Sequence, residues 1–247
     1  MSHAEIHIFP DPGRCGGAGA VALFASSGAQ AVPFSFTASG GCSEACSASA
    51  TITPGAGTLT AVLTDTQANP RSAGDLLSSI EITPSGALGT PTLTSQNGSL
   101  IDVTPGAATG TPVAGNPTHW GVGTSGGQIV LETAGPFAVG GKPINMIIGP
   151  APFTNSNASI GNFDPYIDQT GTFVINDPSI TASTSITGVV FNFGTGPDTF
   201  ITGVPVPAPP IGHSLPVLLA VGGILFGAEF WGRCKKRPLG TAMRHAS

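Results

Sequence analysis

The segment Thr92-Leu-Thr-Ser-Gln-Asn-Gly-Ser-Leu-Ile-Asp-Val103 contains two runs of strand-forming residues, one on each side of Asn97-Gly98. Asn followed by Gly readily takes the positive φ angles of a type I′ turn, which is a common connection between two antiparallel strands. The segment therefore predicts a β-hairpin that turns at Asn97-Gly98.

Alternation of apolar and polar residues continues on both sides of this segment. Leu59, Ala61 and Leu63 alternate with residues that include Thr58, Thr60 and Thr64, which is typical of a strand with one buried face. Similar strands are expected at residues 33–37, 128–133, 143–148, 172–175 and 188–193, and the helical signal is limited to one or two turns in residues 72–79. Many short strands separated by turn residues predict an all-β domain, a β-sandwich or a jelly-roll-like fold, over residues 32–202.

The composition of the chain is poor in charge. Only 9% of the residues are charged, against roughly 25% in an average soluble domain, while 40% are hydrophobic, which is enough for a core. Between residues 32 and 210, ten residues are acidic and two are basic, a net charge of −8. This charge argues against nucleic acid as a partner.

The sequence predicts a membrane anchor in the C-terminal part. Residues 203–214 form a Pro-rich spacer, residues 215–231 an apolar stretch, and residues 232–247 a tail that begins with the basic cluster Arg233-Cys-Lys-Lys-Arg237. A stretch of about 17–25 apolar residues suffices for a transmembrane helix, and a basic flank stays on the cytoplasmic side. A buried core helix is the alternative interpretation of residues 215–231.

The N-terminal part, residues 1–31, is expected to be an irregular signal peptide. Ala29 and Ala31 have the spacing of a signal-peptidase site, behind a short apolar core at residues 18–25. The leader carries only one basic residue before that core, Arg14. The alternative is a leader without a role in export.

The motif Val204-Pro205-Val206-Pro207-Ala208, followed by the apolar stretch and the basic cluster, resembles the PEP-CTERM sorting signal of bacteria, with Val206 in place of the glutamate of Pro-Glu-Pro. In that family the signal is read by exosortase, a membrane transpeptidase-like enzyme, in bacteria that make exopolysaccharide. The resemblance implies a sorting transpeptidase and exopolysaccharide as partners. Together with the expected membrane anchor, it implies an exported protein that is anchored at the cell surface or in the periplasm, or released to the extracellular matrix.

Cysteine is scarce in the expected domain. Cys42 and Cys46 are close enough in sequence to form a small disulfide loop in an oxidising compartment. Free thiols are the alternative, and a zinc site is not expected because the pair lacks further Cys or His ligands nearby.

Residues 162–168 form the most site-like cluster of the chain. Asn162, Asp164 and Asp168 offer oxygen ligands of the kind that Ca²⁺ prefers, and the alternative is a turn with solvated acids. Tyr166 in this cluster, or Trp120 elsewhere, would supply an aromatic ring for stacking on a sugar.

Catalytic patterns are weak. His119 is the only histidine of the expected domain, and no G-x-S-x-G motif is present. We therefore expect no enzyme, no cofactor and no catalytic residue, and a structural or adhesive role for an exported, membrane-anchored surface or matrix protein. A carbohydrate-binding module is one alternative. A secreted polysaccharide hydrolase with paired carboxylates is the other.

Overall fold

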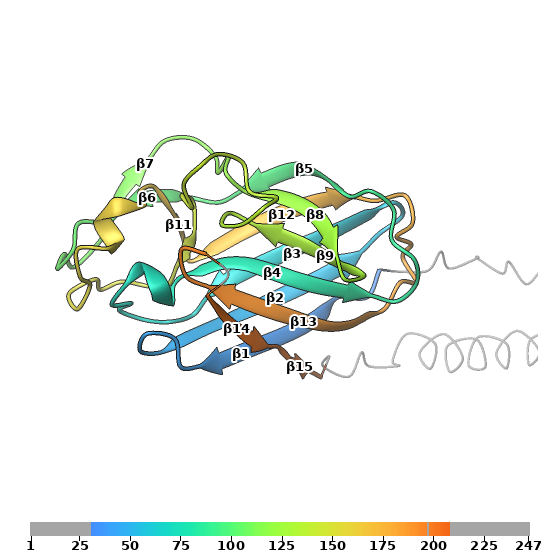
Figure 1. Cartoon of the computed structure of the whole chain (residues 1–247), viewed down its shortest axis with the longest axis horizontal. Coiled ribbons are helices and arrows are strands. Elements are labelled where there is room, and N and C mark those ends of the chain that lie inside the picture. The colour runs from blue at the N-terminus through green and yellow to red at the C-terminus, as the bar shows by residue number, and fades with distance from the viewer. Residues whose placement is uncertain (1–30, 197, 208–247) are drawn as a thin grey trace, which may run out of the picture. The chain divides into compact units, whose positions relative to one another are not determined.

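The computed structural model describes residues 31–196 and 198–207, and these residues are arranged in strands with two short 3-10 helices (Figure 1). The prediction of an all-β domain is confirmed. No helix among these residues is long and apolar enough to cross a membrane. The expected signal peptide up to Gln30, the apolar stretch 215–231 and the tail 232–247 lie outside the described residues.

One sheet has six strands and is built mainly from strands in which every second residue is buried. Small and apolar residues point inward on these strands, as Ala48, Ala50 and Ile52 do, and polar residues alternate with them. The strands in spatial order are β15 (Val204–Val206), β1 (Phe34–Gly40), β2 (Cys46–Pro54), β3 (Thr58–Asp65), β12 (Thr170–Asn176) and β5 (Thr92–Asn97).

The other sheet has nine strands, and β4 is its branching strand, because it pairs with β13, β10 and β9. The 3-10 helices are η1 (Ala73–Asp75) and η2 (Ile160–Asn162). The strands along the main path are β14 (Thr199–Thr202), β13 (Ile186–Phe193), β4 (Leu77–Pro84), β10 (Ile147–Ile148), β11 (Tyr166–Asp168), β6 (Leu100–Asp102) and β7 (Thr111–Val113), and β9 (Gln128–Glu132) and β8 (Gly121–Ser125) extend from β4.

The two sheets share the larger of two buried apolar clusters. Figure 1 looks onto the nine-stranded sheet with the six-stranded sheet behind it. Ile52 and Phe173 from one sheet belong to the same buried cluster as Ile80, Phe191 and Trp120 from the other sheet and its loops. Burial of these side chains is the main stabilising contribution.

The hairpin predicted at Asn97-Gly98 is wrong. β5 pairs with β12 in the six-stranded sheet, whereas β6 pairs with β11 and β7 in the other sheet. Instead, glycine is needed at position 98 because the backbone there packs closely against Ile167 and Thr170. A Cβ on Gly98 would lie 2.7 Å from Ile167 Cγ2 and 3.1 Å from the Thr170 carbonyl oxygen. The chain therefore crosses between the sheets at this point.

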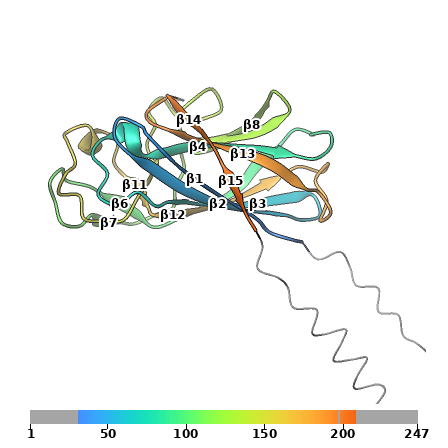
Figure 2. The same ribbon diagram turned by 90° about the horizontal axis from the view of Figure 1, so that it is seen from below.

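Both ends of the described body meet at one sheet edge. β1 and β15 pair in antiparallel fashion, with Ser35 opposite Val206 and Thr37 opposite Val204, so they lie side by side in Figure 2. The start of the expected spacer thus belongs to the six-stranded sheet, and the folded body reaches Val206.

Candidate functional site

The outer face of the six-stranded sheet carries hydroxyl groups and no charge. The outward positions of β1, β2, β3 and β12 face neighbours in register across all four strands. They are Ser35, Thr37, Ser39, Ser47, Ser49, Thr51, Thr53, Thr58, Thr60, Thr64, Thr170 and Thr172, with Val62, Val174 and Asn176 as the other members. We call this surface the hydroxyl face.

The spacing of the hydroxyl face follows from sheet geometry. Neighbouring strands lie about 4.8 Å apart, and outward residues on one strand repeat about every 6.8 Å. Some hydroxyls hydrogen-bond across strands, as Thr64 does with Thr170 at 3.0 Å between their oxygen atoms. The result is a regular, neutral surface that donates and accepts hydrogen bonds.

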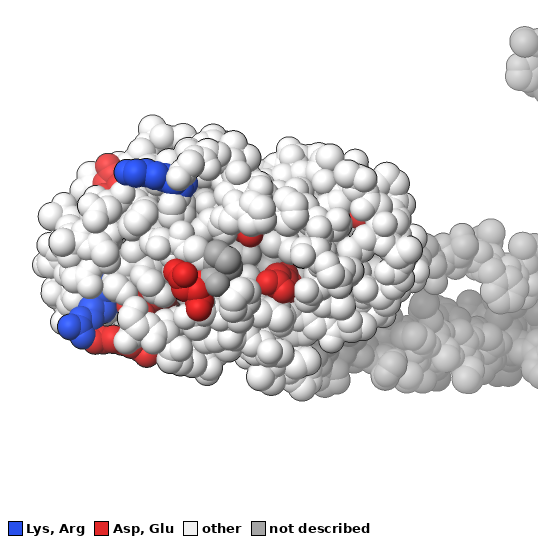
Figure 3. Space-filling model, viewed as in Figure 1, with Lys and Arg blue, Asp and Glu red and all other residues white. Residues whose placement is uncertain are grey.

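A second candidate site lies on the outer face of the nine-stranded sheet, and we call it the acidic hollow. A row of paired residues crosses four strands there, because Ser79 of β4 lies opposite Glu132 of β9 and Asn192 of β13, and Asn192 lies opposite Phe200 of β14. The hollow measures about 270 Å³, and its walls include Glu81, Val130, Glu132, Phe137, Asn192 and Phe200. Figure 3 shows acidic side chains over the middle of this face and basic ones toward the end where β6 and β7 lie.

Hydrogen bonding in the acidic hollow is incomplete. Glu132 is only 4% exposed, and its Oε1 accepts a hydrogen bond from the Phe137 N–H at 2.6 Å. Burial, and to a smaller extent the nearby charge of Glu81, raises the pKa of Glu132 above its usual value. The Asn192 amide nitrogen donates to Glu81 Oε1 at 3.2 Å and to Ser79 Oγ at 3.3 Å. Its Oδ1 is the one buried side-chain nitrogen or oxygen without a partner among residues 31–196 and 198–207.

A loop after β9 closes one side of the hollow, and two glycines of β8 make room for it. A Cβ on Gly121 would lie 1.7 Å from the Phe137 carbonyl oxygen, and one on Gly123 would lie 2.3 Å from the Phe137 ring. Gly135 in the loop has a φ of +139°, and a Cβ there would lie 2.3 Å from Glu132 Oε2. Glycine at these positions thus lets the loop wrap the Glu132 carboxylate.

The three residues that were expected to bind calcium have different surroundings in the structure. The Asp164 carboxylate accepts the Val103 N–H at 2.8 Å, and burial raises its pKa. Asp168 accepts from the Gln169 side chain at 3.2 Å, and Asn162 is exposed at the end of η2. Within the described ranges no three His, Cys, Asp or Glu side chains form a group that could hold a metal. Calcium binding in this loop stays a prediction.

The two aromatic rings expected to stack on sugars are in the core, so that interpretation is wrong. Tyr166 is fully buried, and its hydroxyl donates to the Ile160 carbonyl oxygen, while burial raises its pKa far above the usual value. Trp120 is also fully buried, with its Nε1 donating to the Asn145 carbonyl oxygen at 2.7 Å and its ring centroid 4.6 Å from that of Phe173.

His119 is half-buried beside neutral partners. Its Nδ1 lies 3.1 Å from Thr118 Oγ1 and 3.2 Å from Asn145 Oδ1. Neither contact is the carboxylate that would orient a histidine as a general base. The absence of catalysis stays a prediction.

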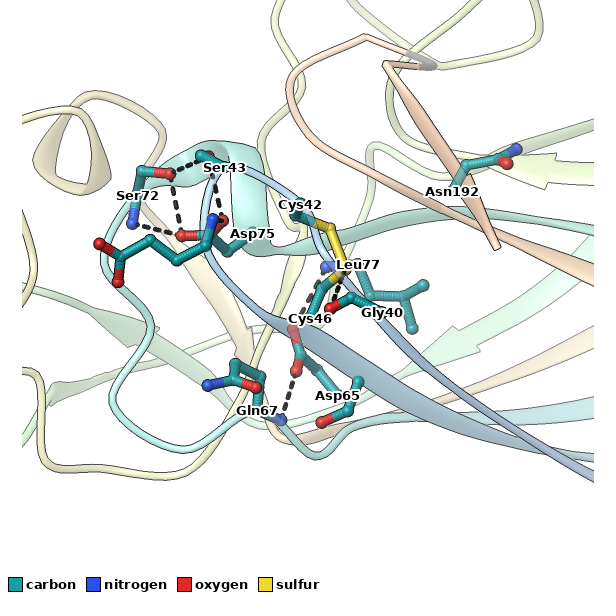
Figure 4. The surroundings of a disulfide bond; sticks show 12 residues. Gly40, Cys42, Ser43, Cys46, Asp65, Gln67, Ser72, Asp75, Leu77 and Asn192 are labelled. Carbon is teal, nitrogen blue, oxygen red and sulfur yellow. Dashed lines mark hydrogen bonds between the residues drawn. A yellow bond between two sulfur atoms is a disulfide. The ribbon is translucent and has the colours of Figure 1, made fainter. Parts of the chain in front are cut away.

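Cys42 and Cys46 are bonded to each other, and the loop that they close is fixed to η1 (Figure 4). Asp75 accepts from Ser43 Oγ at 3.0 Å and from the Glu44 N–H at 3.2 Å, and its other oxygen accepts from Ser72. Through these hydrogen bonds, Asp75 joins the β1–β2 loop to the region before β4. Because the carboxylate is occupied by them, its role is structural.

Asp65 lies next to this cluster and is fully buried. Its carboxylate accepts the N–H groups of Gln67 at 2.9 Å and Leu77 at 3.2 Å. Burial raises the pKa of Asp65 well above its usual value despite these two hydrogen bonds. Asp65 therefore ties the end of β3 to the start of β4 at an electrostatic cost.

The edge where β1 and β15 meet contains an apolar groove of about 290 Å³, lined by residues that include Val32, Phe34, Ile186 and Val206. Ala31, the expected last residue of the signal peptide, is exposed and directly precedes this groove, while Ala29 lies outside the described residues. Of the sorting motif, Val204 to Val206 form β15, Pro207 follows exposed, and Ala208 is outside the described residues.

Sequence reasoning missed Glu81, Glu132 and Asn192 as neighbours. Each of them is a polar residue beside apolar ones in the sequence. What was missing was the order of the strands, which brings β9, β4 and β13 together.

Comparison of the chain with protein-family models, with curated proteins and with solved structures finds no match. Three features of the described residues bear on function: the hydroxyl face, the acidic hollow and the shared edge of β1 and β15.

Proposed function

We propose that this chain is an exported bacterial surface or extracellular-matrix protein with an adhesive or structural role. Its body is a β-sandwich or jelly-roll-like domain, held at the membrane by a C-terminal helix over residues 215–231. Contact with the matrix is made by the hydroxyl face, and no catalytic centre takes part.

The hydroxyl face is the observation that carries this proposal. A typical exposed surface mixes charges of both signs, yet the outward positions of β1, β2, β3 and β12 contain no charged residue. Hydroxyls in a regular array match a neutral, hydroxyl-rich polymer such as exopolysaccharide, because both sides donate and accept hydrogen bonds. Water is displaced from such a face without the cost of stripping charges.

The arrangement of the ends supports display from a membrane. Both ends of the body leave from the pairing of β1 with β15, at one edge of the six-stranded sheet. Residues 208–214 separate Pro207 from the apolar stretch, and a chain of that length reaches at most about 25 Å. The body is then held close to the membrane by this edge, and the hydroxyl face is available to the matrix.

The test is binding of the full chain to exopolysaccharide from the cells that produce it. Replacing Thr51 and Thr60 with Lys places two charges in the middle of the hydroxyl face, and we expect at least about tenfold weaker binding. Thr111→Lys is the control, because Thr111 is exposed on the nine-stranded sheet.

Salt gives a second readout. A contact without charges should keep its affinity when NaCl is raised from about 0.1 M to about 1 M, where screening removes most charge attraction between exposed groups. Equal binding by the Thr51/Thr60 variant and the Thr111 variant contradicts the proposed role of the hydroxyl face. Loss of binding in salt contradicts it as well when the exopolysaccharide has first been N-acetylated, so that it carries no amino groups.

A further inference from the structure

The acidic hollow has an excess of hydrogen-bond acceptors. The carboxylates of Glu81 and Glu132 line it, and so does Asn192, whose Oδ1 is buried without a donor. A buried acceptor without a partner is costly and uncommon in folded proteins. The hollow therefore fits a ligand that brings N–H or O–H donors.

The negative charge of the hollow is also uncompensated. Arg71 and Lys142 are the only Lys and Arg residues in the described part of the chain, neither lines the hollow, and Arg71 is paired with Glu44. Two carboxylates in a partly buried hollow favour a ligand with positive charge, because the attraction is strong where water is excluded.

The walls of the hollow are apolar and aromatic. Phe200 is 55% exposed at the rim, Phe137 is half-buried, and Val130 of β9 lies opposite Glu81 of β4. Aromatic faces attract organic cations and give a sugar ring an apolar surface to pack on. The exposed hydroxyls of Thr124 and Ser125 lie at the same rim.

We propose that the acidic hollow binds the protonated amino group of an aminated sugar, with Glu81, Glu132 and Asn192 Oδ1 as acceptors and the phenylalanine rings against the sugar. That this sugar belongs to a polysaccharide rests on the proposed adhesive function. The chemistry of the hollow stands on its own residues.

A divalent cation fits the hollow less well. Ca²⁺ takes six to eight oxygen ligands, while Glu132 Oε1 already accepts the Phe137 N–H and Glu81 Oε1 accepts the Asn192 amide. An ammonium group needs only about three acceptors, which matches the oxygens that remain.

The test is calorimetric titration of the full chain in detergent with glucosamine oligomers and with N-acetylglucosamine oligomers of the same length. The acetyl group removes the positive charge and leaves the ring, so we expect at least about tenfold tighter binding of the free amine, weakened by salt. Glu81→Gln and Glu132→Gln should each lower the affinity at least about tenfold. Asp102→Asn, which removes an exposed charge on β6, should leave it unchanged.

Three results would overturn the inference. Equal affinity for the two oligomers would show that the site does not recognise the ammonium group. Tighter binding of trilysine than of the glucosamine oligomer would assign the hollow to a peptide. Binding of Ca²⁺ alone, lost in Glu81→Gln, would assign it to a metal. Because these titrations use neither exopolysaccharide nor the hydroxyl face, their failure is distinguishable from failure of the proposed function.

Discussion

Replacement of Gly121 by Ala tests whether the loop over the acidic hollow is packed as described. The new methyl group would lie 1.7 Å from the Phe137 carbonyl oxygen, far inside van der Waals contact, so β8 or the loop must move. Overpacking of this kind costs about 1–3 kcal/mol. If the loop lifts, the hydrogen bond from the Phe137 N–H to the Glu132 carboxylate is lost as well, and bonds to charged groups contribute about 1.5–3 kcal/mol. We expect the free energy of unfolding to fall by about 1–3 kcal/mol from overpacking alone, and by about 2.5–6 kcal/mol if the hydrogen bond is lost as well.

The assay is urea denaturation of the full chain, followed by circular dichroism. Gly188→Ala is the matched control, because Gly188 lies in β13 of the same sheet and a Cβ there meets nothing within 4 Å. Its stability should stay within about 0.5–1 kcal/mol of the parent chain, with a gain expected from the less flexible unfolded state. Equal stability of Gly121→Ala and Gly188→Ala would refute the description of the loop.

Three further predictions concern buried groups. Burial raises the folded-state pKa of Asp65, so its stabilising contribution is complete below the unfolded pKa of about 3.9 and is lost as the pH rises through the folded value. Asp65→Asn should flatten this decline in the free energy of unfolding, measured by denaturation at a series of pH values upward from about pH 4, and an unchanged slope would contradict the assignment. Replacing Cys42 and Cys46 with Ser opens a loop with a sequence separation of 4 and should cost about 2 kcal/mol, whereas equal stability before and after reduction of the parent chain would argue against the bond. Tyr166→Phe removes the buried hydrogen bond to the Ile160 carbonyl oxygen and should cost about 1–2 kcal/mol without changing glycan binding; a loss of glycan binding with unchanged stability would restore Tyr166 as a ligand residue.

Period-two alternation predicted much of the fold. The strands around Leu59 to Leu63, Thr172 to Ile175 and Gly188 to Phe193 all occur, because large apolar residues recur at every second position there. β2 follows the same rule with Ala48 and Ala50 as inward residues, and alanine gives a weaker signal because it is common in every kind of structure.

Two elements were misjudged for local reasons. The run before Ile80 was expected to form helical turns, but η1 is confined to Ala73–Asp75 and β4 begins at Leu77, where Asp65 holds the backbone N–H. The Asn97-Gly98 pair has the sequence of a hairpin turn, and only the packing against Ile167 shows that the glycine serves a crossing between sheets.

The candidate sites depended on pairings that single strands do not reveal. The threonines around Leu59 indicated a polar outer face on one strand. That this face continues over four strands follows only from their register. The acidic hollow joins Glu81, Glu132 and Asn192, which are more than fifty residues apart in sequence, so only the order of β9, β4 and β13 places them together.

Export followed by membrane anchoring underlies the proposed role, and the intact mass of the chain recovered from washed membranes tests it most directly. We predict that the chain in the membrane fraction begins at Val32, and that it is released into the medium when residues 215–237 are deleted. A chain that begins at Met1, or one that stays with the membrane after that deletion, would contradict it.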